Sequence, residues 1–156
     1  MIIKINPKII NFSKGVQKLC LKKGGSFSHG CPNYGVKEGC PPNQPMIDNV
    51  FDFRENIYLI YTEFNVGRFA KHIREKHPGW TDKQCYNPRY WQQGARKEHN
   101  LELDNFLEKY PGLEFNKCPE AHGINVDSLM KDIGVNLEWP PRNLTRIVSL
   151  GGFPKS

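Results

Sequence analysis

The sequence predicts one compact domain, residues 1–156, of the α/β or α+β class. We expect a small sheet, about three helices and an irregular cysteine-bearing loop segment at 14–49, followed by an α/β body at 50–156. The length of 156 residues suits a single domain with a real core. The 38% hydrophobic and 24% charged residues are typical of a soluble globular protein. Strand-like and helix-like apolar patterns then alternate along the body.

The segment at residues 14–49 differs from the rest in composition. It holds six glycines, four prolines and three cysteines, and its few apolar residues have no regular spacing. Such a segment cannot close a hydrophobic core of its own. A bound metal ion would organise it, because metal binding supplies folding free energy where a core is missing.

The body begins with a strand and a helix. Residues 55–64 are apolar and aromatic-rich, which predicts a buried strand. Asn65 is the expected N-cap of the following helix, which Pro78 and Gly79 end. The apolar stripe of that helix is Val66, Phe69, Ala70 and Ile73.

Two further helix starts follow. Thr81 and Gln84 match a capping box. Asn87 and Pro88 fit the N-cap and first turn of a long helix, which we expect to run to Tyr110 before Pro111-Gly112. The expected apolar face of this helix consists of Trp91, Ala95, His99, Leu103, Phe106, Leu107 and Tyr110.

The last two elements are a short helix and a strand. Asn125 is the expected N-cap of the helix, and Gly134 is its C-terminal stop. The apolar stripe is Val126, Leu129, Met130 and Ile133. Residues 145–150 predict the final strand, because the apolar Ile147, Val148 and Leu150 alternate with few polar residues there.

Three cysteines make the irregular segment informative. Cys20, Cys31 and Cys40 are separated by ten and by eight residues, unlike the close C-x-x-C pairs of zinc ribbons. Proline follows Cys31 and Cys40 and stiffens the chain there, while nearby glycines let backbone N–H groups approach sulfur. We predict metal ligands; buried free thiols acting as small hydrophobes are the alternative. The flanking lysines, expected to lower the thiol pKa values, are Lys18, Lys22, Lys23 and Lys37.

A tetrahedral metal or a four-iron cluster needs a fourth ligand. Cys118 is the first candidate, because proline follows it as well. Cys85 lies in a predicted helical turn, where a structural role is an equal alternative. His29 and His122 are further candidates, although a solvated loop position is the commoner role for both. Three protein ligands with an open coordination position are the remaining option.

The other three histidines lie on predicted helices. His99 falls on the apolar face of the long helix, where we expect a hydrogen-bonded core residue. His72 and His77 lie on the basic face of the first helix, where we expect contact with solvent. None of the three is a predicted ligand.

Two motifs resemble a known family. The elements Cys20, Cys31-Pro32-Asn33-Tyr34-Gly35 and Cys40-Pro41-Pro42 resemble the signature of a cysteine-rich, predicted metal-binding family. That family is a domain of unknown function from archaea and anaerobic bacteria. Residues 119–126 are similar to its Glu-Ala-x-Gly-Ile-Asp-Val segment, and Leu101-Glu102 to its Leu-Glu helix. The family carries a further cysteine group before the second motif, where this chain has only Cys118. The resemblance therefore implies one metal centre and no settled reaction.

The function predicted from these residues is metal binding, with a 4Fe–4S iron–sulfur cluster used in electron or sulfur transfer with a redox or sulfur-transfer protein as partner. Thiolates also suit zinc, so the alternative is a non-enzymatic, zinc-stabilised module that docks a protein or RNA partner. Its docking surface would be the basic face formed by Arg68, Lys71, Arg74 and Lys76, near Trp80. The sequence shows no P-loop and no Ser/His/Asp arrangement, so the question of enzymatic activity stays open.

Charge and hydropathy bear on partners and location. The net charge of +6 can attract a nucleic acid, an acidic protein or an anionic substrate, although a generic basic surface is the commoner explanation. The longest apolar stretch, Ile57–Tyr61, is far too short to span a bilayer. The N-terminus has no long apolar core and no cleavage site of small residues. We therefore expect a cytoplasmic protein with no membrane partner.

Overall fold

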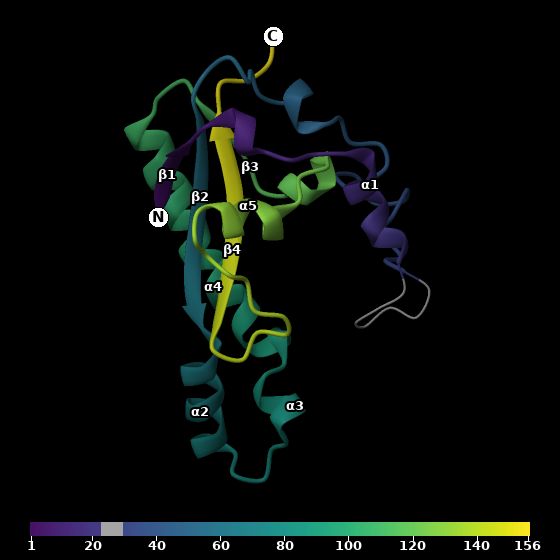
Figure 1. The fold of residues 1–156 in the computed structure, drawn as a ribbon. Helices are drawn as coiled ribbons and strands as arrows, with labels where there is room; N and C mark the ends of the chain where they lie inside the picture. Colours follow the sequence, from purple (N-terminus) through teal and green to yellow (C-terminus); the bar gives the residue numbers. More distant parts are fainter. Residues whose placement is uncertain (23–29) are drawn as a thin grey trace.

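The centre of the fold is an antiparallel four-stranded sheet with the order β1–β2–β4–β3 (Figure 1). The computed structural model describes residues 1–22 and 30–156. The long central strands β2 (Ile57–Asn65) and β4 (Leu144–Gly152) pair along their whole length, with Leu59 opposite Leu150. The short strands β1 (Ile2–Ile5) and β3 (Glu114–Asn116) flank them. The class is α+β, because the sheet is antiparallel and the helices pack on its faces.

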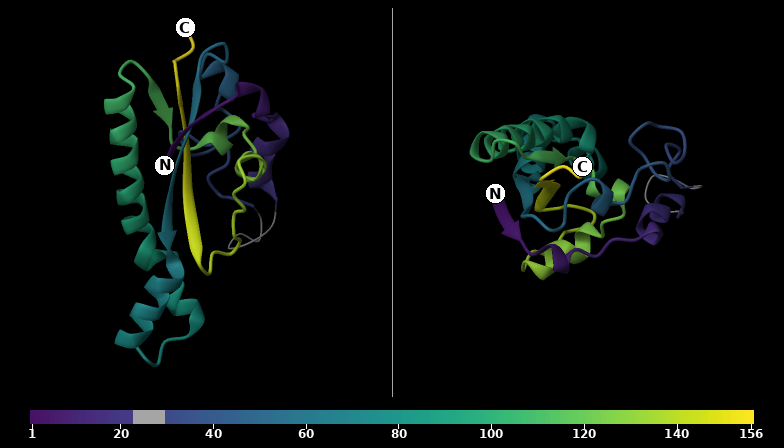
Figure 2. Two further views of the ribbon diagram at one scale, coloured as in Figure 1. Left: turned by 60° about the vertical axis from the view of Figure 1, so that its left-hand side comes forward. Right: turned by 90° about the horizontal axis from the view of Figure 1, so that it is seen from above.

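Helix α4 (Pro88–Lys109) covers one face of the sheet (Figure 2). Side chains alternate along a strand, so Tyr58 and Ile60 point to this face and pack against Leu103 and Phe106 of the helix. Gly151 of β4 gives the Phe106 ring its space, since a Cβ there would lie 2.6 Å from the ring carbon Cε1. The close approach of helix and sheet thus depends on a residue without a side chain.

The opposite face of the sheet carries helix α5 (Val126–Asp132) and most of the remaining chain (Figure 2). Leu59 and Leu150 meet Leu129 and Met130 of α5 in the largest apolar cluster. Two 3-10 turns, Ile47–Asn49 and Pro119–His122, also lie on this side. The second turn belongs to the motif at 119–126, so the cysteine-bearing segment and that motif share one face of the sheet.

Helices α2 (Val66–Lys76) and α3 (Asp82–Cys85) extend beyond the end of the central strands (Figure 1). All four predicted caps are confirmed: Asn65, Thr81, Asn87 and Asn125 each accept a hydrogen bond from a backbone N–H in the first turn. The capping box of Thr81 and Gln84 is also present. These side chains satisfy N–H groups that have no partner within the helix.

Part of the segment at 14–49 is more regular than predicted. Helix α1 (Lys14–Gln17) and a 3-10 helix (Lys18–Leu21) precede the first cysteine turn. Ser13 caps α1 by accepting from Val16 N–H. The rest of the described part of this segment is irregular up to the 3-10 turn at Ile47–Asn49. Within residues 1–22 and 30–156, none of the helices combines the length and the hydropathy needed to cross a bilayer.

Candidate metal centre

The motif at 119–126 is hydrogen-bonded to the residues just before the cysteine-bearing segment. Ser13 N–H donates to the carbonyl of Gly123 at 2.8 Å, and Asn125 N–H donates to that of Asn11 at 3.2 Å. Gly123 has a φ of +88°, and a Cβ there would lie 2.8 Å from the carbonyl oxygen of Ser13. Only glycine fits this conformation and this space. Backbone hydrogen bonds therefore join these two stretches of chain.

Two buried polar side chains complete this connection. The amide of Gln17 donates to the carbonyls of Ala121 at 2.8 Å and Gln44 at 3.0 Å. His122 is buried, and its Nδ1 lies 2.7 Å from the carbonyl oxygen of Pro45. The expectation of a solvated His122 is wrong, because the 3-10 turn directs the ring into the interior. Gln17 and His122 thus join the motif to residues on both sides of the cysteine turns.

The cysteine turns are themselves closed by backbone hydrogen bonds. Cys31 N–H donates to the carbonyl of Cys20 at 2.7 Å, which brings the ends of the intervening stretch together. Gly35 N–H donates to the carbonyl of Pro41, also at 2.7 Å, and closes the turn that leads to Cys40. The backbone thus ties Cys31 to Cys20 and closes the turn before Cys40.

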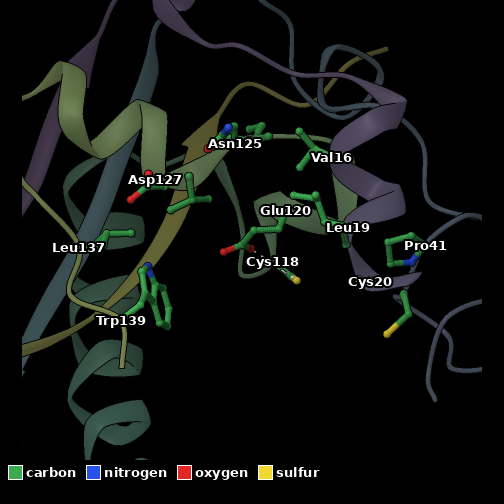
Figure 3. Close-up of a pocket in the computed structure, with 14 residues that line it drawn as sticks. Val16, Leu19, Cys20, Pro41, Cys118, Glu120, Asn125, Asp127, Leu137 and Trp139 are labelled. Atoms are coloured by element: carbon green, nitrogen blue, oxygen red, sulfur yellow. Dashed lines mark hydrogen bonds between the residues drawn. The ribbon is translucent and has the colours of Figure 1, made fainter. Parts of the chain in front are cut away.

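Cysteines distant in sequence meet at one pocket with a volume of about 440 Å³ (Figure 3). Cys20, Cys40 and Cys118 line it, whereas Cys31 lies beside Cys20. Cys118 is exposed and the other three thiols are partly buried. The pocket walls are mainly apolar and come from α1, the 119–126 motif and the stretch before β4. The apolar lining includes Val16, Leu19, Pro41, Ala121, Ile124, Val126, Leu137 and Trp139.

The pKa values reflect the proximity of these thiols. Burial is the main cause that raises the pKa of Cys20, and the nearby thiols of Cys31 and Cys40 raise it further. Burial also raises the pKa of Cys118, to which Glu120 and then Cys40 add. Cys40 thus lies near enough to affect the pKa values of both Cys20 and Cys118. Among the described residues no lysine lowers the pKa of Cys20 or Cys118, contrary to the expectation from the sequence.

Glu120 is a carboxylate beside Cys118. The Cys118 thiol donates to Glu120 Oε2 at 3.8 Å. Glu120 as a whole is exposed to solvent. Protein atoms packed around its carboxyl group nevertheless raise the pKa of that group. The pocket therefore offers the carboxylates of Glu120 and Asp127 beside three sulfur donors, and Asp127 forms an ion pair with Lys131. The described residues contain no group of three or more His, Cys, Asp or Glu side chains already spaced for a single metal ion.

Cys85 and the described histidines do not line the pocket. Cys85 is fully buried in α3, in contact with the Arg74 side chain, and takes the structural role. His99 is a buried core residue, as predicted: its ring nitrogens lie 3.0 Å from Thr62 Oγ1 and 2.7 Å from Ser149 Oγ. Residues 23–29, with Lys23 and the candidate His29, lie outside the described residues. His72 and His77 are exposed, as predicted.

The basic face of α2 is separate from the pocket. Arg68, Lys71, Arg74 and Lys76 are exposed, and Arg74 forms an ion pair with Asp82. The Trp80 ring stacks on the His77 ring, with the ring centroids 4.2 Å apart. The tilted Tyr90 ring lies on the Trp80 ring with a centroid separation of 5.3 Å. Both neighbours occupy surface of the Trp80 ring that a stacked base would need.

The chain was compared with models of known protein families, with curated proteins and with solved structures. No match is found. The chemistry of the site is therefore inferred from its cysteines and their surroundings alone.

Sequence reasoning missed three residues of the site. Gln17 gave a weak signal, as a polar residue directly after Val16 in a segment with little apolar character. Glu120 was noted in the second motif, but its position beside Cys118 follows from the 3-10 turn. Trp139 lies in a proline-rich turn that sequence patterns do not place near cysteines. Only their tertiary contacts reveal these roles.

Proposed function

We propose that Cys20, Cys31, Cys40 and Cys118 bind a metal centre, an iron–sulfur cluster of the 4Fe–4S type that serves electron or sulfur transfer. The observation that carries the proposal is that Cys20, Cys40 and Cys118, from three separate stretches of chain, line one pocket, while the backbone of Cys31 is hydrogen-bonded to that of Cys20. Four thiolates are the common ligand set of such clusters. A cysteine that acts only as a small hydrophobe is buried in the core away from other thiols, as Cys85 is in this chain.

The pocket favours a cluster over a single zinc ion. Its volume of about 440 Å³ leaves space between the walls for several iron and sulfide atoms. One zinc ion held by four thiolates fills the space between its ligands and needs no pocket of this size. The apolar walls also suit a cluster, because limited solvent access and local dielectric tune its reduction potential.

Cys118 is the proposed fourth ligand and differs from the other three in two respects. It comes from a distant part of the chain, and its thiol is hydrogen-bonded to Glu120. If only the three N-terminal cysteines bind, one iron keeps an open position, and Cys118 with Glu120 lies beside it. A cluster with an open iron can bind a substrate atom, whereas a fully ligated cluster transfers electrons.

The first experiment is anaerobic purification with analysis of iron, sulfide and zinc. A 4Fe–4S cluster gives a brown protein with broad absorbance near about 400 nm and about four irons per chain. The Cys31→Ser variant should lose the cluster, since a hydroxyl is a poor ligand for iron of this type. The matched control is Cys85→Ala, which removes a thiol outside the site and should keep full iron content.

Two other outcomes are informative. A colourless protein with about one zinc per chain would support the zinc-stabilised module and contradict the cluster. Unchanged metal content in serine variants of Cys20, Cys31 and Cys40 would contradict the ligand assignment itself. Cys118→Ser separates three ligands from four, because the cluster is lost only if Cys118 is a ligand.

A further inference from the structure

Large apolar side chains are exposed around the proposed centre. Leu19 and Leu21, on either side of Cys20, are 48% and 52% exposed. Trp139, on the opposite wall of the pocket, is 73% exposed. Exposed apolar residues grouped around a site are typical of surfaces that contact another protein.

Lysines surround these apolar side chains. Lys18 and Lys22 are exposed at the two ends of the 3-10 helix that carries Cys20. Lys37 is exposed in the last turn before Cys40, whose N–H donates to the Lys37 carbonyl at 3.1 Å. Across residues 1–22 and 30–156, none of these lysines forms an ion pair. We call Lys18, Leu19, Leu21, Lys22, Lys37 and Trp139 the docking face.

We propose that the docking face binds a small acidic electron-transfer protein that exchanges one electron with the centre. This inference rests on the proposed function and names the partner of the same site. The partner's reduced carrier loses one electron, and the centre gains it; the reverse step restores both. No bond is formed or broken, so the proteins need only bring their two centres close together.

The composition of the docking face supports this class of partner. Unpaired lysines attract an acidic surface over a distance and speed the encounter, while a few apolar contacts hold the complex briefly. Transient electron-transfer complexes have small interfaces, in keeping with a face built around one helical turn and the pocket rim. The basic face of α2 differs in that its Arg74 is already paired with Asp82, although acidic Glu38 and Glu120 also lie near the docking face.

The test uses the metal-loaded protein and a reduced acidic [2Fe–2S] ferredoxin as the probe. Stopped-flow absorbance measures the rate of electron transfer at increasing ionic strength. The second-order rate constant should fall about tenfold or more between low and high salt, because screening removes the attraction. A basic cytochrome c serves as the contrasting probe and should show no such decrease.

Charge reversal assigns the effect to the docking face. Lys18→Glu/Lys22→Glu should lower the rate constant at low salt about tenfold or more, in the range of charge effects on association. The matched control is Lys71→Glu/Lys76→Glu on α2, with the same change in net charge, which should alter the rate less than about twofold. Equal effects of the two double variants, or a rate independent of salt, would overturn the proposal.

A second readout separates this proposal from the metal centre. Calorimetric titration with oxidised ferredoxin measures binding whether or not the chain holds iron. The anaerobically purified protein could hold no iron and still bind the ferredoxin, with the binding lost in Lys18→Glu/Lys22→Glu. This result would support the docking face and contradict the cluster. An iron-loaded protein that neither binds the ferredoxin nor accepts an electron from it would contradict the docking face. The same result would not contradict the proposed cluster.

Discussion

The backbone N–H of Cys31 donates a hydrogen bond to the carbonyl oxygen of Cys20 at 2.7 Å. This bond sets the separation of two proposed ligands through the main chain. Gly30 makes the approach feasible, because its φ is +86° and a Cβ there would lie 2.8 Å from the Leu21 carbonyl oxygen and 2.9 Å from that of Cys20. The arrangement of the first two cysteines is therefore fixed by backbone geometry.

The first prediction concerns this glycine. Gly30→Ala should displace Cys31 from Cys20, since the contacts of the added methyl group are backbone atoms that cannot move aside. We expect loss of most bound iron after anaerobic reconstitution. Gly39→Ala is the control, because Gly39 also has a φ of +86° but no atom within 4 Å of the added Cβ. It adds about 1 kcal/mol of backbone strain without a collision. Equal iron content in both variants would contradict the prediction.

The second prediction concerns Gln17. Gln17→Ala removes hydrogen bonds to two carbonyls and should lower the free energy of unfolding by about 1–3 kcal/mol. Urea unfolding of the apo protein measures the effect without a contribution from metal. Gln93→Ala, at an exposed position of α4, should stay within about 0.5 kcal/mol of the parent protein. A loss below that value for Gln17→Ala would show that these bonds do not hold the site together.

The third prediction concerns the contact between α4 and the sheet. Gly151→Ala should destabilise the protein by about 1–3 kcal/mol, because the new methyl group collides with the Phe106 ring. Gly79→Ala is the control, since open space surrounds that position. The double variant Gly151→Ala/Phe106→Leu should be more stable than the sum of its single variants predicts, because the smaller side chain relieves the collision. Strict additivity in thermal or urea unfolding would contradict this contact.

The fourth prediction concerns the pH dependence of stability. Burial is the main cause that lowers the pKa of His99 to about 4; the charges of Lys117 and the N-terminal amine lower it further, and Glu102 opposes them. Between pH 6.5 and about 4 the unfolded chain binds a proton that the native chain does not, so stability falls as the pH falls. The expected loss is on the order of 2–3 kcal/mol.

Urea unfolding at several pH values measures the His99 effect. His99→Gln should lower stability at pH 7, because the hydrogen bonds to Thr62 and Ser149 change, yet flatten the acidic decrease. His72→Gln, which replaces an exposed histidine, should leave the decrease as it is. An unchanged acidic slope in His99→Gln would assign the effect to other groups.

The elements with local signals could be predicted from the sequence. The caps Asn65, Asn87 and Asn125 predict the starts of α2, α4 and α5. Each cap side chain accepts from a backbone N–H no more than three residues later, so the signal is local in the sequence. Strand β2 was predicted from its apolar run. Strands β1 and β3 were not, since four and three residues carry no detectable alternation. Their pairing with β2 and β4 depends on contacts between distant residues.

The sequence identifies candidate residues for the site but not their arrangement in space. Residue type alone makes Cys20, Cys31 and Cys40 candidates, and the proline after Cys118 adds the fourth. Whether these thiols meet depends on the connection made by Gln17 and Gly123, which lies in tertiary packing and leaves no local pattern. The same packing buries His122, which sequence reasoning placed in solvent.

Strand β3 is an edge strand that pairs with β4. Cys118 follows β3 after a single residue, so its position depends on the last strand of the sheet. During translation the first three cysteines leave the ribosome long before β4 exists. In the proposed four-cysteine centre, Cys118 would therefore reach its place only once β4 has joined the sheet, whereas the first three cysteines do not follow an edge strand that pairs with β4.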